Sequence, residues 1–348
     1  MVNVLLVRLS AIGDVVHTAP LACALKDHWP EARLTWVAER PGGELLIGHR
    51  AIDELILLPR RFLRSPGEMV RLVGRLRQIA PQVAIDAQGL TKSALVCRLS
   101  GAPRRIGFGH PWGREISRWL NNECVDTRSV HAVPRNLELL RPLGIESPEV
   151  RFDLPEAPAD RAYAEELIEQ YGLARRTGGF ALITAGAGWE SKRWPAERFA
   201  AVARHLAVRH GLGVLLIWGS DAERALAEGV ARESGTADTQ PAPRLSLPQL
   251  AALARRARLF VGGDTGPLHI AAAVDTPCVG LYGPWPAAGH GPYGAKHIAV
   301  QVEYLEGSTR QRRRASRRFI EAISVEAVCD ACDCILRREG VAANAFCA

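Results

Sequence analysis

The residues that most clearly suggest ligand binding lie at 259–273, where an apolar run leads into Gly262-Gly263-Asp264-Thr265-Gly266. Glycines allow a ligand to approach the backbone closely. A helix that begins there directs unpaired N–H groups and the positive end of its dipole toward the same point. The hydroxyl of Thr265 and the imidazole of His269 can also donate to phosphate oxygens. The segment therefore predicts a phosphate-binding turn.

A second segment whose residues could take part in a reaction follows the apolar run at the start of the chain. Gly13 permits a tight turn there, and Asp14 stands at the beginning of an expected helix. A carboxylate in that place can take a proton from a substrate hydroxyl, but an aspartate can equally cap the helix, and the local sequence leaves both open. The segment lacks the G-x-G-x-x-G pattern and the acidic ribose ligand, which disfavours a nicotinamide-binding domain.

Two further strand ends in the second half of the chain carry polar residues. The glycine-rich stretch 185–188 precedes Lys192 and Arg193, which suit a diphosphate. Asp221 and Glu223 follow the run at 213–218, where an acid can bind ribose hydroxyls. As alternatives, the cations can be surface charges and the acids can cap a helix. Taken with the turn at 264–266, the three strand ends fit a nucleotide diphosphate.

The order of elements predicts how these residues are positioned. Apolar strand-like runs alternate with amphipathic helical stretches, which indicates an α/β fold with parallel sheets. Since 348 residues exceed what one hydrophobic core usually supports, we expect two doubly wound domains, at 1–155 and 156–325, and a cysteine-containing tail at 326–348. The proline-containing stretch 153–160 marks the crossing between the domains. Ligands in such sheets bind at the carboxyl ends of the strands.

The expected elements have the following bounds. Strands are expected at 2–7, 34–37, 54–58, 83–86, 180–184, 213–218, 259–261 and 278–282. Helices are expected at 14–28, 68–79, 91–99, 161–171, 197–210, 221–234, 247–257 and 265–273.

Composition indicates an ordinary globular protein, with 47% hydrophobic and 23% charged residues. The apolar start is too short for a signal peptide, and the longest uncharged stretch, 276–295, contains four prolines and five glycines, which argues against a membrane-spanning helix. We therefore expect a cytoplasmic protein.

The positive charge is concentrated in one place. Six of the nine residues from Arg310 to Arg318 are arginine, and without them the formal net charge of +7 falls to +1. This distribution argues against a nucleic-acid surface along the whole chain. The run itself can meet phosphates of a lipid headgroup or a polynucleotide, or it can be a solvated loop.

The eight cysteines fall into two groups. Four in apolar surroundings are expected to be small core residues: Cys23, Cys97, Cys124 and Cys278. Four lie near the C-terminus and could hold zinc or iron: Cys329, Cys332, Cys334 and Cys347. Because their C-x-C step is unlike a common zinc knuckle, free thiols are the favoured interpretation.

Several motifs together resemble glycosyltransferase family 9, the ADP-heptose:lipopolysaccharide heptosyltransferases. They are Ser10-x-x-Gly13-Asp14-x-x-His17-Thr18-x-Pro20, Asp86-Ala87-Gln88-Gly89-Leu90-x-Lys92-Ser93, Lys192-Arg193-Trp194-Pro195 and Asp264-Thr265-Gly266-x-x-His269. The second motif, with Arg114-Glu115 and His131-Ala132-Val133 after it, is most similar to the heptosyltransferase I type. The matches run in order from residue 2 to about residue 300, whereas residues from about 303 onward match nothing in the family.

The resemblance implies a GT-B fold of two Rossmann-like domains, with the acceptor on the first domain and ADP-heptose on the second. It implies inverting transfer of L-glycero-D-manno-heptose to a Kdo sugar of Kdo2-lipid A in lipopolysaccharide inner-core biosynthesis, with Asp14 as the general base. The implied donor-binding residues are Gly13, Lys192, Glu223, Asp264, Thr265, Gly266 and His269. The implied acceptor-binding residues are Arg60, Arg61, Arg64 and Arg114.

No Asp-x-Asp motif follows an expected strand, so we expect transfer that needs no metal or other cofactor. We expect the protein to act at the inner face of the inner membrane, with a peripheral contact through Arg310–Arg318 and no nucleic-acid partner. Two alternatives stay open: a family 9 enzyme with another nucleotide sugar or acceptor, and a non-catalytic nucleotide- or RNA-binding protein. The presence of both Asp14 and Lys192 disfavours the second.

Overall fold

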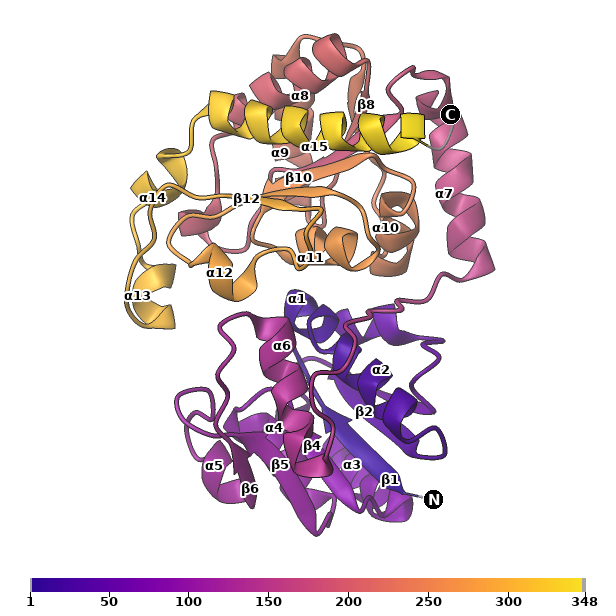
Figure 1. Cartoon of the computed structure of the whole chain (residues 1–348), viewed down its shortest axis with the longest axis vertical. Coiled ribbons are helices and arrows are strands. Elements are labelled where there is room, and N and C mark those ends of the chain that lie inside the picture. The colour runs from indigo at the N-terminus through magenta and orange to yellow at the C-terminus, as the bar shows by residue number, and fades with distance from the viewer. Residues whose placement is uncertain (1, 346–348) are drawn as a thin grey trace. The chain divides into compact units, whose positions relative to one another are not determined.

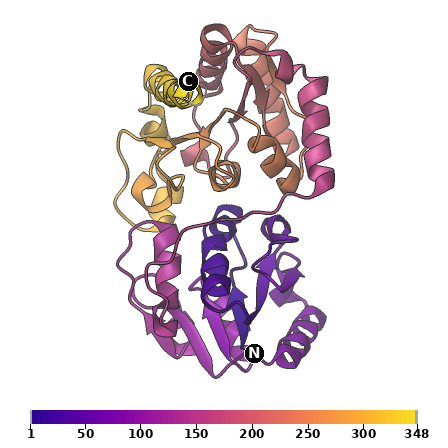
Figure 2. The same cartoon turned by 45° about the vertical axis from the view of Figure 1, so that its right-hand side comes forward.

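The chain forms two compact units that divide between Pro155 and Glu156, as a computed structural model shows. The structure describes residues 2–345. Each unit consists of one parallel six-stranded sheet with helices on its two faces (Figure 1, Figure 2).

The sheet of the first unit begins with a fully apolar central strand. Val4 to Val7 of β1 (Asn3–Val7) are completely buried, as expected for a parallel strand that is covered on both faces. The strand order is β3 (Glu54–Leu58), β2 (Arg33–Glu39), β1, β4 (Val83–Asp86), β5 (Arg104–Phe108) and β6 (Glu123–Val125). The helices are α1 (Ile12–Val16), α2 (Ala19–His28), α3 (Pro66–Ile79), α4 (Thr91–Leu99), α5 (Ser117–Leu120) and α6 (Ala132–Leu137), with 3-10 turns at Gly42–Leu46, Phe62–Arg64 and Glu138–Leu143.

The sheet of the second unit repeats the same topology. Its strand order is β12 (Ile298–Val300), β11 (Cys278–Leu281), β10 (Leu259–Gly263), β7 (Phe180–Thr184), β8 (Gly213–Leu216) and β9 (Thr239–Pro241). The helices are α7 (Pro158–Gln170), α8 (Ala196–His210), α9 (Asp221–Ser234), α10 (Leu247–Ala254), α11 (Gly266–Ala273), α12 (Ala287–His290), α13 (Thr309–Arg313), α14 (Arg318–Glu321) and α15 (Val325–Ala345), with 3-10 turns at Leu173–Arg175 and Glu190–Lys192. Counted within each unit, both sheets have the order 3-2-1-4-5-6 of a dinucleotide-binding fold.

The expected helix at 14–28 is two helices. It begins earlier, at Ile12, and breaks between α1 and α2, because a helical Pro20 would clash with the carbonyl of Val16 and lacks an N–H to donate. The break is held by side chains: the Asn136 amide donates to the carbonyl of His17 (3.0 Å) and to the hydroxyl of Thr18 (3.1 Å). The expectation of one continuous helix was therefore wrong.

The segment 326–348, expected to be a tail, belongs to the second unit over its described part. Residues 325–345 form α15, which packs against α8 (Figure 1). Val328, Cys332 and Ile335 are almost completely buried in the same core as α8 and the sheet, at a spacing that places them on one helix face. Hydrophobic packing thus makes this segment part of the domain.

Two other expectations also fail. Cys124, expected in the core, is exposed on β6, which lies at the edge of its sheet. Strands β5, β6, β9 and β12 were not anticipated: Arg104 at the start of β5 pairs with Glu123 of β6 (2.7 Å), and such polar pairs conceal strands from a search for apolar runs. Among the described residues, no helix combines the length and the apolar character needed to cross a membrane.

Candidate functional site

Asp14 of the first unit, and Lys192 and Asp264 of the second, follow strands that flank the point where the strand order of their sheet reverses. In the first unit this point lies between β1 and β4, and in the second unit it lies between β7 and β10. Open α/β sheets bind ligands at such switch points because the loops diverge there and leave a crevice. Each unit therefore has its own candidate site.

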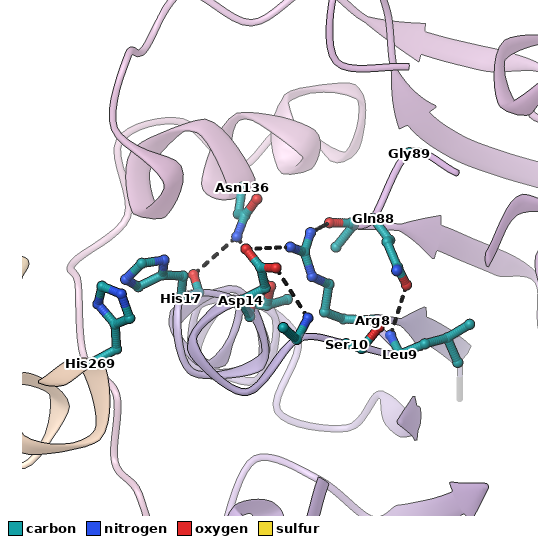
Figure 3. Close-up of polar contacts among 12 residues, drawn as sticks. Arg8, Leu9, Ser10, Asp14, His17, Gln88, Gly89, Asn136 and His269 are labelled. Carbon is teal, nitrogen blue, oxygen red and sulfur yellow. Dashed lines mark hydrogen bonds and ion pairs between the residues drawn. The ribbon is translucent and has the colours of Figure 1, made fainter. Parts of the chain in front are cut away.

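In the first unit, Asp14 lies in the first turn of α1 with its side chain about one-third exposed (35%). One carboxylate oxygen contacts Arg8 Nη2 at 2.7 Å, and the other accepts a hydrogen bond from the Ala11 N–H at 3.1 Å (Figure 3). The second contact is part of the N-terminal cap of α1, so the interpretation of Asp14 as a capping residue is confirmed. It does not account for Arg8, which aligns a carboxylate that solvent still reaches.

Two cations that sequence analysis did not assign surround Asp14. Arg8 follows β1 directly and also donates to the carbonyl of Ala87, so its guanidinium is fixed between the ends of β1 and β4 (Figure 3). Arg135 of α6 is buried against the ring of Trp112, at 3.6 Å from its centroid. Burial and the charge of Arg8 lower the pKa of Arg135 to about 10, with Asp14 acting in the opposite direction, so Arg135 stays charged at neutral pH.

The block 86–93 shapes the neighbouring loop. The buried Asp86 carboxylate accepts hydrogen bonds from the N–H groups of Gln88 (3.1 Å) and Gly89 (3.0 Å) and from the Asn121 amide (3.1 Å). Burial raises the pKa of Asp86, although these hydrogen bonds work in the opposite direction. Gly89 has φ +67°, and a Cβ there would lie 2.5 Å from the Trp112 carbonyl, so the loop requires glycine. Asp86 therefore positions the backbone.

Lys92, at the start of α4, provides a third cation at this end of the sheet. Its ammonium contacts the Glu39 carboxylate at 3.0 Å and the Ser10 hydroxyl at 3.1 Å. Glu39 ends β2, so this contact links the loops after β1, β2 and β4. Lys92 belongs to the motif Asp86–Ser93, but its position in the sequence alone did not indicate a role for it.

The arginines assigned to the acceptor lie on exposed loops of the first unit. Arg60, Arg61 and Arg64 follow β3 at the edge of the sheet, and Arg114 follows β5. All four are exposed, and within residues 2–345 none of them forms a salt bridge. They are available to an anionic ligand, but no residue in their surroundings fixes their geometry.

Gly13 does not form the tight turn that the sequence suggested. It is the second residue of α1, and its carbonyl accepts a helical hydrogen bond from the His17 N–H at 2.9 Å. The turn expectation is therefore wrong: Gly13 belongs to the helix that presents Asp14.

In the second unit, Lys192 and Asp264 form a nearly buried ion pair at the switch point. Lys192 Nζ contacts Asp264 Oδ2 at 2.5 Å and the Asp264 carbonyl at 3.2 Å, and it lies 4.3 Å from the ring centroid of Trp285. His269 Nε2 is 3.2 Å from Asp264 Oδ1. Burial alone raises the pKa of Asp264, but the Lys192 charge and the His269 contact outweigh it and hold the pKa well below the usual range. Lys192 is therefore not a surface charge; Arg193 beside it is exposed.

The turn before α11 directs backbone donors toward the same place. Thr265 is the N-cap residue, and its hydroxyl donates to the carbonyl of Gly263 (3.2 Å). Gly266 and Leu268 open the helix on either side of Pro267, which has no N–H. First-turn N–H groups lack acceptors within the helix, so this end of α11 can bind an anion beside Lys192. His269 turns toward Asp264 and supports the turn through that carboxylate.

Glu223 joins the ends of β7 and β8. Its carboxylate accepts a hydrogen bond from the Gly219 N–H at 2.9 Å, and a Cβ at Gly186 would lie 2.6 Å from its side chain. Ser220 is the N-cap of α9, so neither acid fills that position. Asp221 and Glu223 do lie in the first turn of α9, where negative charge favours the helix dipole. The half-buried Glu223 is left close to the glycine-rich loop and able to accept from a hydroxyl.

The C-terminal cysteines do not form one cluster in the described part of the chain. Cys332 is buried in the core, whereas Cys329 and Cys334 are half-buried, and all three are free thiols. Cys347 lies outside the described residues. The arginine run occupies α13, the following loop and the start of α14, and is mostly exposed.

Comparison with known proteins shows the family. The model of glycosyltransferase family 9 (heptosyltransferase) matches residues 69–318. The expectation that nothing from about residue 303 onward matches the family was therefore wrong for residues 303–318. Lipopolysaccharide heptosyltransferase 1 of Pseudomonas aeruginosa is 32% identical over 311 residues, covering 87% of this chain and 84% of that protein. The enzyme of the same name from Salmonella typhimurium is 31% identical, covering 85% and 93%.

Solved structures confirm the predicted GT-B fold. A glycosyltransferase family 9 structure from Veillonella parvula has a TM-score of 0.82 at 24% identity and covers 97% of each chain. The E. coli heptosyltransferase WaaC with ADP has a TM-score of 0.74 at 24% identity, covering 94% of this chain and 97% of that one. From its strand-end motifs, its two repeated sheets and these similarities, the chain belongs to glycosyltransferase family 9, the heptosyltransferase family.

Proposed function

We propose that this protein transfers L-glycero-D-manno-heptose from ADP-heptose to a Kdo sugar of Kdo2-lipid A, with inversion at the anomeric carbon. The observation that carries the proposal is the Arg8–Asp14 pair at the switch point of the first unit. Its carboxylate is aligned and open to solvent, which is what a general base requires. The names of the relatives, lipopolysaccharide heptosyltransferase 1, support the sugar and the pathway.

In this reaction an acceptor hydroxyl oxygen bonds to the anomeric carbon as the bond from that carbon to the ADP phosphate breaks. Asp14 takes the hydroxyl proton, and the electron pair of the broken bond leaves with ADP. An aspartate is a weak base, so it accepts the proton late, from a hydroxyl held within about 3 Å. Arg8 holds the carboxylate in one orientation, which reduces the reorganisation that this step needs.

On the donor side, Lys192 and the first turn of α11 are proposed to bind the pyrophosphate and stabilise the negative charge that builds up on ADP. Lys192 is already held beside that turn by Asp264. Groups that are preorganised where charge develops contribute strongly, because they do not reorganise during the reaction. Glu223 is proposed to accept hydrogen bonds from the ribose hydroxyls, and E. coli WaaC with ADP supports a nucleotide diphosphate as ligand.

We propose that transfer needs no metal ion, because Lys192 and the helix end supply the positive charge that a divalent cation would otherwise supply. Turnover is therefore expected to persist after dialysis against EDTA. Loss of turnover that Mg²⁺ restores would contradict this.

On the acceptor side, the exposed Arg60, Arg61, Arg64 and Arg114 are proposed to meet the phosphates and carboxylates of the acceptor. A peripheral contact with anionic lipid at the inner face of the inner membrane is proposed for Arg310–Arg318. Each arginine near such a surface contributes about 1 kcal/mol. Co-sedimentation with anionic vesicles is expected to fall when these six arginines are neutralised, and unchanged binding would remove the membrane contact from the proposal.

The decisive experiment compares wild type and Asp14→Asn in transfer from ADP-heptose to Kdo2-lipid A. We expect turnover in the first and its near-absence in the second, with the same melting temperature and the same affinity for ADP. If wild type bound ADP without turnover, the proposed nucleotide site would be supported, and heptose as the sugar or Kdo2-lipid A as the acceptor would be rejected. Neither binding nor turnover would reject the proposed function.

A further inference from the structure

A group of side chains that the transfer reaction does not use lies in the second unit, between α8 and α15. His205 Nε2 and His210 Nε2 of α8 are each 2.7 Å from the same oxygen, Asp333 Oδ1 of α15. The Asp333 side chain is only 6% exposed, and each histidine side chain is 21% exposed. Three potential ligand atoms thus converge, all within 4.8 Å of one another.

We propose that His205, His210 and Asp333 bind a zinc ion that fastens α15 to α8. Imidazole nitrogen and carboxylate oxygen are ordinary zinc ligands, at about 2.0–2.2 Å from the ion. Tetrahedral geometry at those bond lengths separates neighbouring ligand atoms by roughly 3.3 Å. Each histidine nitrogen therefore has to move only about half an ångström away from Asp333 Oδ1 to admit the ion.

The packing around the three side chains holds them together in advance of a bound cation. Core packing of Val328, Cys332 and Ile335 already holds α15 on the domain, so the ligands are brought together before any metal binds. Arg209 Nε lies 3.3 Å from Asp333 Oδ2, the carboxylate oxygen that does not face the histidines. A metal-bound carboxylate is oriented by such a contact to its second oxygen.

Among the described residues, the atoms that converge within 4.8 Å do not include a cysteine sulfur, so the fourth ligand has to be a solvent molecule or a side chain that turns toward the ion. We expect Cys329 to take this place. It lies four residues before Asp333 on α15, a separation that places two side chains on the same helix face. It is half-buried, whereas Cys332 points into the core and Cys334, one residue after Asp333, leaves the helix in another direction. Of the cysteines that the sequence grouped together and the structure describes, Cys329 is therefore the candidate to complete a His₂AspCys site.

The test uses the full-length protein, stripped with a chelator and titrated with Co²⁺, whose absorption reports both geometry and thiolate ligation. We expect one equivalent to bind with the intense visible bands of a tetrahedral site and a near-ultraviolet thiolate band, and Zn²⁺ to displace it. Zn²⁺ alone is expected to raise the melting temperature, because an ion that binds only the folded state stabilises it.

Matched variants separate the ligands. His205→Gln and His210→Gln retain an amide donor toward Asp333, so α15 stays attached, but each is expected to weaken Co²⁺ binding at least tenfold. Cys329→Ser is expected to abolish the thiolate band, and Cys334→Ser on the same helix is expected to leave it unchanged. Circular dichroism checks that each variant is folded.

Two results would overturn the proposal. If both histidine variants still bound one equivalent of Co²⁺ with the thiolate band, cysteines alone would hold the metal. Absence of binding at micromolar Co²⁺ and Zn²⁺ would mean that the three side chains form only a hydrogen-bonded contact between the helices. Because the proposed transfer does not use these residues, either result leaves the proposed function untouched.

Discussion

The switch points of the two units each hold an aspartate beside a cation, but the two carboxylates differ in how much of each solvent reaches. Asp14 contacts Arg8 and one backbone N–H and is 35% exposed. Asp264 contacts both Lys192 and His269 and is 11% exposed. A carboxylate that is to take a proton needs an oxygen that substrate can reach, whereas a carboxylate enclosed by two partners serves to position them. The repeated topology thus supports a base in one unit and an anchor for a cation in the other.

The largest expected effect comes from removing each carboxylate in turn. Asp14→Asn is expected to lower kcat by about 10²–10⁴-fold, the usual contribution of a general base, with little change in stability or ADP affinity. Asp264→Asn is expected to weaken ADP binding and to lower the melting temperature, because Lys192 and His269 lose their shared partner. Transfer assays, calorimetry with ADP and thermal unfolding measure the three quantities. If both variants showed the same pattern, the distinction between base and anchor would be wrong.

The next effect concerns Lys192. Lys192→Met is expected to weaken ADP binding by about 10- to 150-fold, the equivalent of losing one hydrogen bond from a charged group, 1.5–3 kcal/mol. Arg193→Met is the matched control, since it removes an adjacent but exposed cation. Calorimetric titration with ADP provides the comparison, and equal losses in the two variants would indicate general charge attraction without a specific contact.

A smaller effect is expected from Arg8, which acts through Asp14. Arg8→Met is expected to lower kcat by about tenfold while ADP affinity stays constant, and Arg8→Lys is expected to recover part of the loss. Rescue by Arg8→Lys is the readout that a purely structural role would not give, because only a cation at this place restores the contact to Asp14. Equal losses of kcat in the two variants would argue that Arg8 only braces the loop.

The smallest effect concerns the dependence of stability on pH. The folded-state pKa of Asp264 lies below its ordinary value of 3.8, so its contribution to stability is complete above that value and is lost as the pH falls through the folded pKa. The difference in unfolding free energy between wild type and Asp264→Asn should therefore be largest near neutral pH and shrink below about pH 4. Denaturant titrations at pH 7 and pH 3 measure it; a difference that grew on acidification would contradict the assigned direction.

Much of the fold could be predicted because its signals are local. The runs at Glu54–Leu58, Val83–Asp86 and Phe180–Thr184 have the bounds that the sequence indicates, since continuous apolar residues bounded by turn residues define a buried strand. The strands β5 and β6 were missed because Arg104 and Glu123 satisfy each other across the sheet edge. That pairing joins residues nineteen positions apart and leaves no local pattern.

The candidate site was predictable as a set of residues but not as a set of contacts. Asp14, Lys192 and the 264–266 turn stand out because each follows an apolar strand. Arg135 does not stand out, because it lies within a helix far along the chain and comes near Asp14 only in the folded unit. The division of the C-terminal cysteines between core and surface likewise depends on which face of α15 packs against α8.

The α/β class, the repeated strand-end motifs and the family were predictable from the sequence, since they depend on residue types and on spacing along the chain. The folded structure was needed to show which carboxylate is exposed and which is enclosed, and that His205, His210 and Asp333 meet. Exposure and ion pairing depend on side chains that come from distant segments. Their positions are set by the packing of helices on the two sheets, which no local pattern records.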